Sequence, residues 1–332
     1  VKHVEKIVRT MVDGGIFGQA GISIQTFDEP TLDIINRKNI KTERYDDLTR
    51  TFRESKLPVY TDLMLGLPGS TVESTKADLQ RCIERDVMVR SYPTQLLTNS
   101  PMNAPDYREK FQIVTDDRKM LVSTSSYTAE EREEMDRVVS VFHAAESYGT
   151  VRQVMRWVAH RQAVPEIDVL QAIGTRAAAE PARYPLTSWL LARFMENSVP
   201  PGSWMLFYDE IEAIIGLEWG MELLTDGEWP TVRKVQLGLM PERGRAFPDV
   251  LELDHDYVAW SYRYSEARAD GVDPSEVVPR LSEFGPGDLE ITDPNKVCDE
   301  QMGAWHWSAD YHYWELGSPL ARHLGGRWAP SR

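Results

Sequence analysis

The chain has 332 residues and a formal net charge of −15, and 42% of its residues are hydrophobic and 27% charged. This is the composition of a globular protein, not of a disordered one. The negative charge argues against a general nucleic-acid surface, since phosphate binding needs clustered Lys and Arg. No run of about 18 apolar residues occurs, and no basic leader precedes an apolar stretch, so the sequence predicts neither membrane insertion nor secretion. We expect a cytoplasmic protein with small-molecule or protein partners.

The first predicted element is a helix over residues 1–14, where apolar side chains recur at helical spacing. The glycine-rich stretch GGIFGQAG comes next and superficially resembles a dinucleotide-binding loop. Such a loop must follow a strand and open a helix, whereas these glycines follow a helix and precede a strand. We therefore interpret Gly14 and Gly15 as a helix end and a turn.

Strands and helices then alternate. The predicted elements are, in chain order, a strand over residues 22–25, a helix from Glu29, a helix over 45–55, a strand over 59–65, a helix over 72–85 and a strand over 87–96. This alternation indicates a parallel α/β sheet, which binds ligands at the carboxyl ends of its strands. A sheet that started with strand 22–25 would leave an apolar edge unpaired, so we expect the chain to be the latter part of a longer barrel. The absence of an initial methionine is consistent with this expectation.

Three motifs in this region resemble radical S-adenosylmethionine (radical SAM) enzymes. GISIQTFDEPTLDIINRKN (residues 21–39) looks like the fourth strand of their partial (β/α)6 barrel with its helix, and VYTDLMLGLPGSTVES (59–74) looks like the fifth strand. SYPTQLLTNSPMNAPDYREKF (91–111) looks like the sixth strand and the exit segment. The resemblance covers about residues 1–125 and is strongest to the group that often carries a cobalamin-binding domain. It implies an α/β fold with the second half of the barrel over residues 1–115, followed by a mainly α C-terminal domain over 116–332.

The resemblance also implies that this half of the barrel contacts S-adenosylmethionine. The expected contacts are Ser23, Gln25, Asp62, Gly66, Leu67, Gly69 and Gln95. The side-chain amide of Gln25 offers donors and acceptors to ribose hydroxyls or to a methionyl carboxylate. Glycines at 66 and 69 would let backbone peptide groups come close to an adenine.

Simpler interpretations of these positions stay open. Gln25 could be a polar residue that closes a strand, and residues 66–69 could form an ordinary turn. The pattern of alternation does not decide whether Asp62 faces the inside or the outside of a barrel. Gln95 and Asn99 could face the barrel mouth or be solvated in a loop.

One requirement of the family is missing from the sequence. Radical SAM enzymes hold a [4Fe–4S] cluster with the three thiolates of a CxxxCxxC loop. Cys82 and Cys298 are the only cysteines here, and they form neither this triplet nor a disulfide framework. The glycine-rich motif of the family's second strand is absent as well. We therefore expect no metal site on this sequence, so the cluster and the radical reaction belong to a longer parent only, and the use of cobalamin stays open.

The second part of the chain is predicted to be mainly helical. Helices are expected from Thr128 and near residues 149–161, 166–175, 185–197 and 207–224. After residue 230 short alternating stretches indicate strands or a helix bordering them. The ELDHDY run (252–257) could support acid–base chemistry or bind a cation, or it could be a solvated strand end. The aromatic and histidine-rich tail (305–314) could line a substrate pocket or ligate a metal, or pack against the helices.

Three hypotheses follow. The leading one is a fragment of a radical SAM enzyme that needs the missing N-terminal half of the barrel and acts on a small molecule, with radical methyl transfer implied if the parent uses cobalamin. The alternative is a non-catalytic scaffold or partner-binding protein that retains a half-barrel. An ordinary β/α-barrel lyase or hydrolase is disfavoured, because no metal triad or nucleophile lies at the strand ends. Whether this chain by itself is an enzyme stays open.

Overall fold

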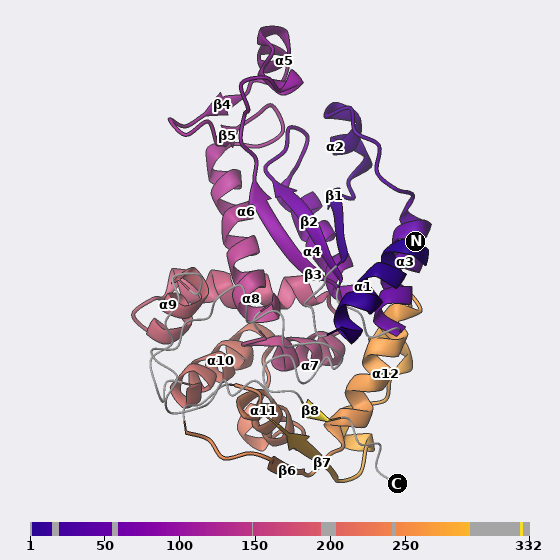
Figure 1. The fold of residues 1–332 in the computed structure, drawn as a ribbon. Coiled ribbons are helices and arrows are strands. Elements are labelled where there is room, and N and C mark those ends of the chain that lie inside the picture. Colours follow the sequence, from indigo (N-terminus) through magenta and orange to yellow (C-terminus); the bar gives the residue numbers. More distant parts are fainter. Residues whose placement is uncertain are drawn as a thin grey trace. The chain divides into compact units, whose positions relative to one another are not determined.

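The computed structural model describes residues 2–14, 20–54, 59–147, 149–193, 204–240, 244–292 and 326–327. The chain divides into two compact units, Val1–Val139 and Ser140–Arg332 (Figure 1). The domain boundary at residue 115 marks where the barrel-like pattern ends, and it stays a prediction. Gly15, Cys298 and the tail at 305–314 lie outside the described residues.

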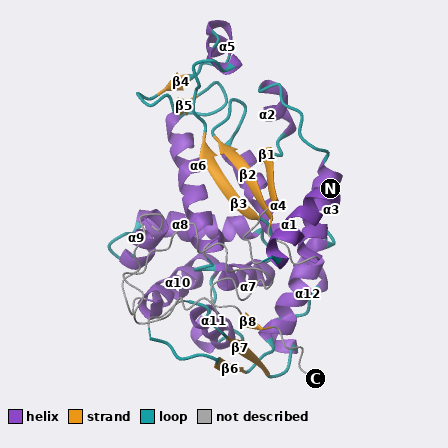
Figure 2. Ribbon diagram, viewed as in Figure 1, coloured by secondary structure: helices purple, strands orange, loops and turns teal. Residues whose placement is uncertain are grey.

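A three-stranded parallel sheet forms the centre of the first unit (Figure 2). Its strands are β1 (Ala20–Gln25), β2 (Val59–Leu65) and β3 (Met88–Pro93), in the order β1-β2-β3. The helices of the alternating pattern are α1 (Lys2–Asp13), α2 (Glu29–Ile34), α3 (Thr42–Glu54) and α4 (Val72–Glu84). The mixed α/β fold with parallel strands is therefore confirmed, and it is consistent with a partial barrel.

One face of this sheet is buried under helices. α1 packs against β1, α3 packs against β2, and α4 packs against both β2 and β3. In β1 the buried side chains of Ile22 and Ile24 alternate with exposed positions. In the buried layer the hydroxyl groups of Tyr45 on α3 and Thr61 on β2 are hydrogen-bonded at 2.6 Å. The side chains of Ser23 and Asp62 lie on the opposite face of the sheet, here called the open face because α1, α3 and α4 leave it uncovered.

A short hairpin follows the sheet. After β3 come η1 (Pro101–Asn103), α5 (Pro105–Lys110), β4 (Val114–Thr115), β5 (Leu121–Ser123) and the long helix α6 (Ala129–Phe142). Leu96, Ile113 and Leu121 form the small core of this region. Figure 1 shows α2, α5 and the β4–β5 hairpin at the top of the view, where β1 and β3 end. The carboxyl ends of the strands are therefore surrounded by short elements of the same unit.

The second unit is mainly helical, as the sequence predicts. Its elements are η2 (His143–Ser147), α7 (Arg152–Gln162), α8 (Glu166–Ala179), α9 (Pro185–Arg193), α10 (Trp204–Trp219), η4 (Leu223–Thr225), α11 (Trp229–Gly238), β6 (Asp249–Leu253), α12 (Tyr257–Ala269), α13 (Pro274–Val277), η5 (Leu281–Glu283), β7 (Gly287–Ile291) and β8 (Gly326–Arg327). The last three strands form an antiparallel sheet in the order β6-β7-β8.

Helix α7 lies at the centre of the second unit, since its side chains from Arg152 to His160 are buried. α8 and α11 pack against it. The buried guanidinium of Arg152 is paired with the carboxylate of Glu146 at 2.5 Å and also donates to the Glu146 carbonyl oxygen. A buried charge needs such a partner, so this pair is part of the core structure.

No helix in the described parts of the chain is both long enough and apolar enough to cross a membrane.

Candidate functional site

A polar row crosses the open face of the sheet in the first unit. The parallel register places Ser23 beside Asp62, and Asp62 beside Arg90. Ser23 Oγ donates a hydrogen bond to Asp62 Oδ2 at 2.7 Å. The other carboxylate oxygen of Asp62, Oδ1, is buried and has no hydrogen-bond partner among the described residues. The register therefore places Asp62 on the face of the sheet that α1, α3 and α4 do not cover.

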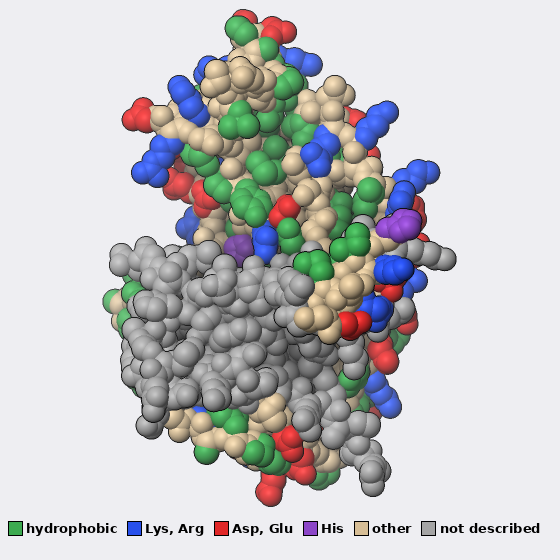
Figure 3. Space-filling view, in the orientation of Figure 1, with side chains coloured by type: hydrophobic (Ala, Val, Ile, Leu, Met, Phe, Trp, Pro, Cys, Tyr) green, Lys and Arg blue, Asp and Glu red, His purple; other side chains and the backbone are tan. Residues whose placement is uncertain are grey.

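Aromatic and basic side chains lie next to this row. The guanidinium of Arg90 stacks on the ring of Tyr60, 3.9 Å from its centroid. The Tyr60 ring in turn lies over Gly21, where a Cβ atom would come within 2.5 Å of the tyrosine hydroxyl. In Figure 3 hydrophobic side chains gather over the strands of the first unit, and charged side chains lie mostly at the margins. The open face thus combines apolar area with a few placed polar groups, which is typical of small-molecule sites.

Gln25 occupies an unusual backbone position at the carboxyl end of β1. Its φ angle is 70°, in the left-handed region, and the register with β2 shifts between Ser23 and Gln25. For a residue with a Cβ atom this conformation costs about 1 kcal/mol or more. Within the described residues no hydrogen bond is formed by the side-chain amide of Gln25, which is partly buried.

The segment after Gln25 is fixed by hydrogen bonds from three other places. The carboxylate of Asp78 on α4 accepts from the Phe27 N–H at 2.8 Å, and the side chain of Asn39 donates to the Thr26 carbonyl oxygen at 2.8 Å. Arg37 donates through Nη2 to the Ser23 carbonyl oxygen at 2.8 Å. These contacts hold the backbone on both sides of Gln25, so the strained residue keeps its place.

Asp78 is itself an unusual group, because its carboxyl is buried at 7% exposure. Burial raises the pKa of Asp78 to about 7, and the nearby carboxylate of Asp28 acts in the same direction. The Phe27 N–H, the Thr26 hydroxyl and the Arg81 guanidinium oppose this shift without cancelling it. The Asp78 carboxyl, which holds the β1–α2 loop by accepting from the Phe27 N–H, therefore changes its protonation near neutral pH.

The GLPG turn after β2 is held by the chain itself. Gly66 and Gly69 have φ angles of 74° and 102°, which a residue with a side chain rarely adopts. The Gly66 carbonyl oxygen accepts from the Tyr127 hydroxyl at 2.7 Å, and the Gly69 N–H donates to Ser126 Oγ at 2.9 Å. Leu67 is buried at 2% exposure, and its carbonyl oxygen accepts from the Ser70 N–H at 3.0 Å. The expected ligand contacts of this turn stay a prediction, and several of its backbone groups already have partners.

Gln95 and Asn99 lie away from the polar row. Gln95 is exposed, forms a bridge with Met120 and donates through its side chain to the Arg118 carbonyl oxygen at 2.8 Å. Asn99 is exposed in the loop before η1. Gln95 thus binds the hairpin, and its expected contact with a ligand stays a prediction.

Some residues of this region have no role in the sequence analysis. Arg90 could have been found there, because the alternation of β3 places it on the same face as its neighbours in register. Arg37 appears there only as part of the matched stretch 21–39. Ser126 and Tyr127 carry no sequence signal, since they meet the GLPG turn only through a contact about 60 residues away along the chain.

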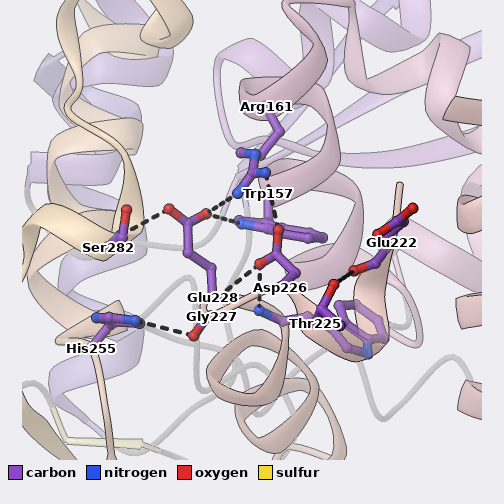
Figure 4. Close-up of polar contacts among 10 residues, drawn as sticks. Trp157, Arg161, Glu222, Thr225, Asp226, Gly227, Glu228, His255 and Ser282 are labelled. Carbon is purple, nitrogen blue, oxygen red and sulfur yellow. Dashed lines mark hydrogen bonds and ion pairs between the residues drawn. The ribbon is translucent and has the colours of Figure 1, made fainter. Parts of the chain in front are cut away.

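The second unit contains a buried carboxylate whose contacts are shown in Figure 4. Glu228 accepts hydrogen bonds from Trp157 Nε1 at 2.8 Å, from Arg161 Nη1 at 2.8 Å and from the Ser282 N–H at 2.9 Å. Arg161 also pairs with Asp226 at 3.0 Å. Burial alone would raise the pKa of Glu228, but these hydrogen bonds outweigh it and lower the pKa to about 2. The arrangement fits a structural junction, since both carboxylate oxygens have protein partners.

The ELDHDY run has structural contacts in the same unit. The His255 ring is hydrogen-bonded to the Phe284 carbonyl oxygen at 3.1 Å and to the Gly227 carbonyl oxygen at 3.2 Å, and Figure 4 shows the second contact. Asp256 caps α12 by accepting from the Ala259 N–H at 2.9 Å. No group of three or more acidic, histidine or cysteine side chains suited to a metal ion exists among the described residues. We therefore assign this run to packing and helix capping.

Cys82, the cysteine in the described part of the chain, does not fit as a ligand of an iron–sulfur cluster. Cys82 is fully buried, and burial raises the pKa of its thiol far above the usual value. Such a thiol stays protonated, whereas a cluster ligand must be a thiolate. The cluster of a radical SAM enzyme would need cysteines other than those of this sequence.

Comparison with known proteins identifies the class of the first unit. Residues 2–82 match the Radical SAM superfamily. This stretch covers α1, β1, α2, α3, β2 and most of α4, so the match lies within the first unit. The resemblance seen in the motifs is thereby confirmed.

Three individual proteins refine this class. The chain is 28% identical over 139 residues to the cobalamin-dependent radical SAM methyltransferase TokK of Streptomyces tokunonensis, covering 41% of this chain and 20% of that protein. The same values hold for the 2-(S-pantetheinyl)-carbapenam-3-carboxylate methyltransferase of Streptantibioticus cattleyicolor. Heme chaperone HemW of Lactococcus lactis is 25% identical over 80 residues, which make up 24% of this chain and 21% of that protein. The chain spans about a fifth of the length of these relatives, and two of the three are methyltransferases.

Proposed function

We propose that the first unit supplies the S-adenosylmethionine-contacting half of a radical SAM barrel, in an enzyme that transfers a methyl group to a small molecule with the help of cobalamin. The observation that carries this proposal is the polar row at the end of β1 and on β2. It contains a buried carboxylate oxygen of Asp62 that has no hydrogen-bond partner among the described residues, and Gln25, whose backbone is strained, ends the strand that carries Ser23. Strained backbone and unsatisfied polar groups in a folded protein point to a function that needs them.

The donors and acceptors of this row fit the polar parts of S-adenosylmethionine. The free carboxylate oxygen of Asp62 can accept from a ribose hydroxyl, and the Gln25 amide can both donate and accept. Ser23 holds the Asp62 carboxylate in place through its hydrogen bond at 2.7 Å. Arg37 lies next to this site, and its guanidinium suits the methionyl carboxylate. When bound in a complete enzyme of this class, S-adenosylmethionine supplies the radical that activates the substrate.

The remaining parts of such an enzyme would come from outside this sequence. A radical SAM barrel needs further strands beside β1, the three cluster cysteines and, in cobalamin-dependent members, a cobalamin-binding domain. Similarity to relatives several times longer than the matched region supports this part of the proposal. The second unit, which lies outside the superfamily match, would contribute substrate selectivity.

Direct binding of S-adenosylmethionine to the chain, measured by isothermal titration calorimetry, tests the proposal. Wild type is expected to bind, and Asp62→Asn is expected to bind about tenfold to a hundredfold more weakly, because a hydrogen bond to a charged group contributes about 1.5–3 kcal/mol. Asp33→Asn is the matched control, since Asp33 lies exposed on α2. Equal affinities of wild type and Asp62→Asn would contradict the assigned site. Absence of binding in wild type would favour the non-catalytic scaffold.

A further inference from the structure

We propose that residues 124–132, here called the clamp segment, position the GLPG turn for the adenine of S-adenosylmethionine. The clamp segment lies outside the matched stretch 2–82. Its side chains act on the turn and not on the ligand, so Ser126 and Tyr127 are positioning residues. The inference rests on the proposed function, because it assigns a role to the turn that the S-adenosylmethionine site requires.

The first contact of the clamp segment is made by Tyr127. Its hydroxyl donates to the Gly66 carbonyl oxygen at 2.7 Å, and its side chain is buried at 3% exposure. Burial raises the pKa of Tyr127 well above the usual value, so the hydroxyl stays protonated and remains a donor. The bond fixes the orientation of the Gly66–Leu67 peptide group, which would otherwise have more conformational freedom because Gly66 has no Cβ atom.

The second contact is made by Ser126. Its Oγ accepts from the Gly69 N–H at 2.9 Å and is also hydrogen-bonded to Thr124 Oγ1 at 2.9 Å. The Thr124 hydroxyl in turn accepts from the Ser126 N–H at 3.2 Å. This local network holds the serine side chain in one place, so both ends of the GLPG turn are tied to the same short segment.

Close packing on both glycines completes the arrangement. A Cβ atom at Gly66 would lie 2.6 Å from Nε of Arg132, and one at Gly69 would lie 3.0 Å from the Cα atom of Thr31 on α2. The Arg132 side chain is buried, and its Nη1 pairs with Asp136 at 2.5 Å. The turn therefore packs between α2 and the clamp segment, and of its four residues Gly69 is the one that is only partly buried.

The clamp segment keeps the GLPG turn ordered before a ligand binds, and this order should raise the affinity for the ligand. A binding loop that is already ordered loses less conformational entropy when it binds. Because the turn contains two glycines, it has more freedom to lose than other turns. Loosening the clamp segment should therefore weaken ligand binding even though none of its residues touches the ligand.

The test combines S-adenosylmethionine binding with amide hydrogen exchange at Gly69. Tyr127→Phe and Ser126→Ala each remove one hydroxyl and should weaken binding by about threefold to tenfold, the usual effect of one neutral hydrogen bond. Exchange at Gly69 should become faster in both variants. Ser126→Thr keeps a hydroxyl and should retain both properties. Ser125→Ala is the matched control, because its side chain is exposed in the same segment.

The outcomes separate this inference from the proposed function. Weaker binding in Tyr127→Phe and Ser126→Ala, with retention in Ser126→Thr and Ser125→Ala, supports the clamp. Unchanged binding in all four variants overturns the clamp and leaves the proposed function standing. If wild type does not bind, the proposed function fails and the clamp falls with it. If Tyr127→Phe does not fold, the comparison of Ser126→Ala with Ser126→Thr decides.

Discussion

At the residue scale, Asp62 and Gln25 owe their positions to different causes. Asp62 lies on the open face by strand parity, since it alternates with the buried Thr61 and Leu63. Gln25 has a left-handed backbone angle at a shift in register, where it pairs with Leu63. The motif predicts both residues, but only the register of β1 with β2 shows that the Asp62 carboxylate turns away from the helices. Strain at Gln25 has no sequence signal, because it depends on hydrogen bonds from distant residues.

Asp78 gives a prediction that concerns pH. Its pKa is raised to about 7, whereas an unfolded aspartate has a pKa of about 3.9, so the folded state binds the proton more tightly. The contribution of Asp78 to stability is therefore fully present below about pH 4 and declines as the pH rises to about 7, by a few kcal/mol at most. Asp78→Asn cannot ionise and should lose this decline.

Urea unfolding of the first unit at pH 4.5 and pH 7.5 measures the effect. The stability of Asp78→Asn relative to wild type should increase between the two pH values. Asp47→Asn, with an exposed side chain on α3, is the control and should follow wild type. Parallel pH profiles of wild type and Asp78→Asn would show that the carboxyl is not perturbed in this way.

At the element scale, the sequence predicts best a strand that pairs with parallel strands along its whole length. β2 is found where the apolar pattern places it, at Val59–Leu65, because it is central and has strands on both sides. The third strand is expected to reach residue 96 but ends at Pro93. Beyond Pro93 the chain pairs with the β4–β5 region, where the Leu121 N–H donates to the Thr94 carbonyl oxygen at 3.0 Å. An apolar run does not reveal this change of partner.

The helices of the second unit show the same limit. α10 is expected over 207–224 but runs from Trp204 to Trp219, because Gly220 with a φ angle of 61° ends it. α11 (Trp229–Gly238) is not predicted, although Pro230 lies in its first turn, a position that favours helix starts. Its start depends on Asp226, which accepts from the N–H groups of Glu228 and Trp229 at 2.8 and 3.1 Å.

Glu228 gives a prediction for the junction of α7, α11 and η5. Glu228→Gln replaces the charged acceptor of Arg161 and brings an amide N–H group against donors, which should lower the free energy of unfolding by about 3 kcal/mol. The pKa of Glu228 is lowered to about 2, so wild type should also lose stability as the pH falls from about 4 to about 2, and the variant should not. Thermal unfolding followed by circular dichroism measures the effect on stability. Glu222→Gln, at an exposed position, is the control, and an equal effect of both variants would refute the assigned role.

At the scale of the whole molecule, the sequence predicts the class of the first unit but not the task of the second. The first unit contains motifs whose spacing follows from strand and helix lengths in a barrel, and the match over residues 2–82 agrees with them. The second unit is predicted to be helical and is so, yet helical packing carries no chemistry of its own. The described part of the second unit uses its buried charges to join helices.

We propose above that this chain works as part of a radical SAM enzyme whose cluster cysteines are encoded elsewhere. The most direct test is to determine the nucleotide sequence upstream of the Val1 codon. We predict that the open reading frame continues upstream into a segment with a CxxxCxxC motif, at a distance that fits the first strand of the same barrel. A start codon immediately before Val1 would contradict the claim and would favour the non-catalytic scaffold.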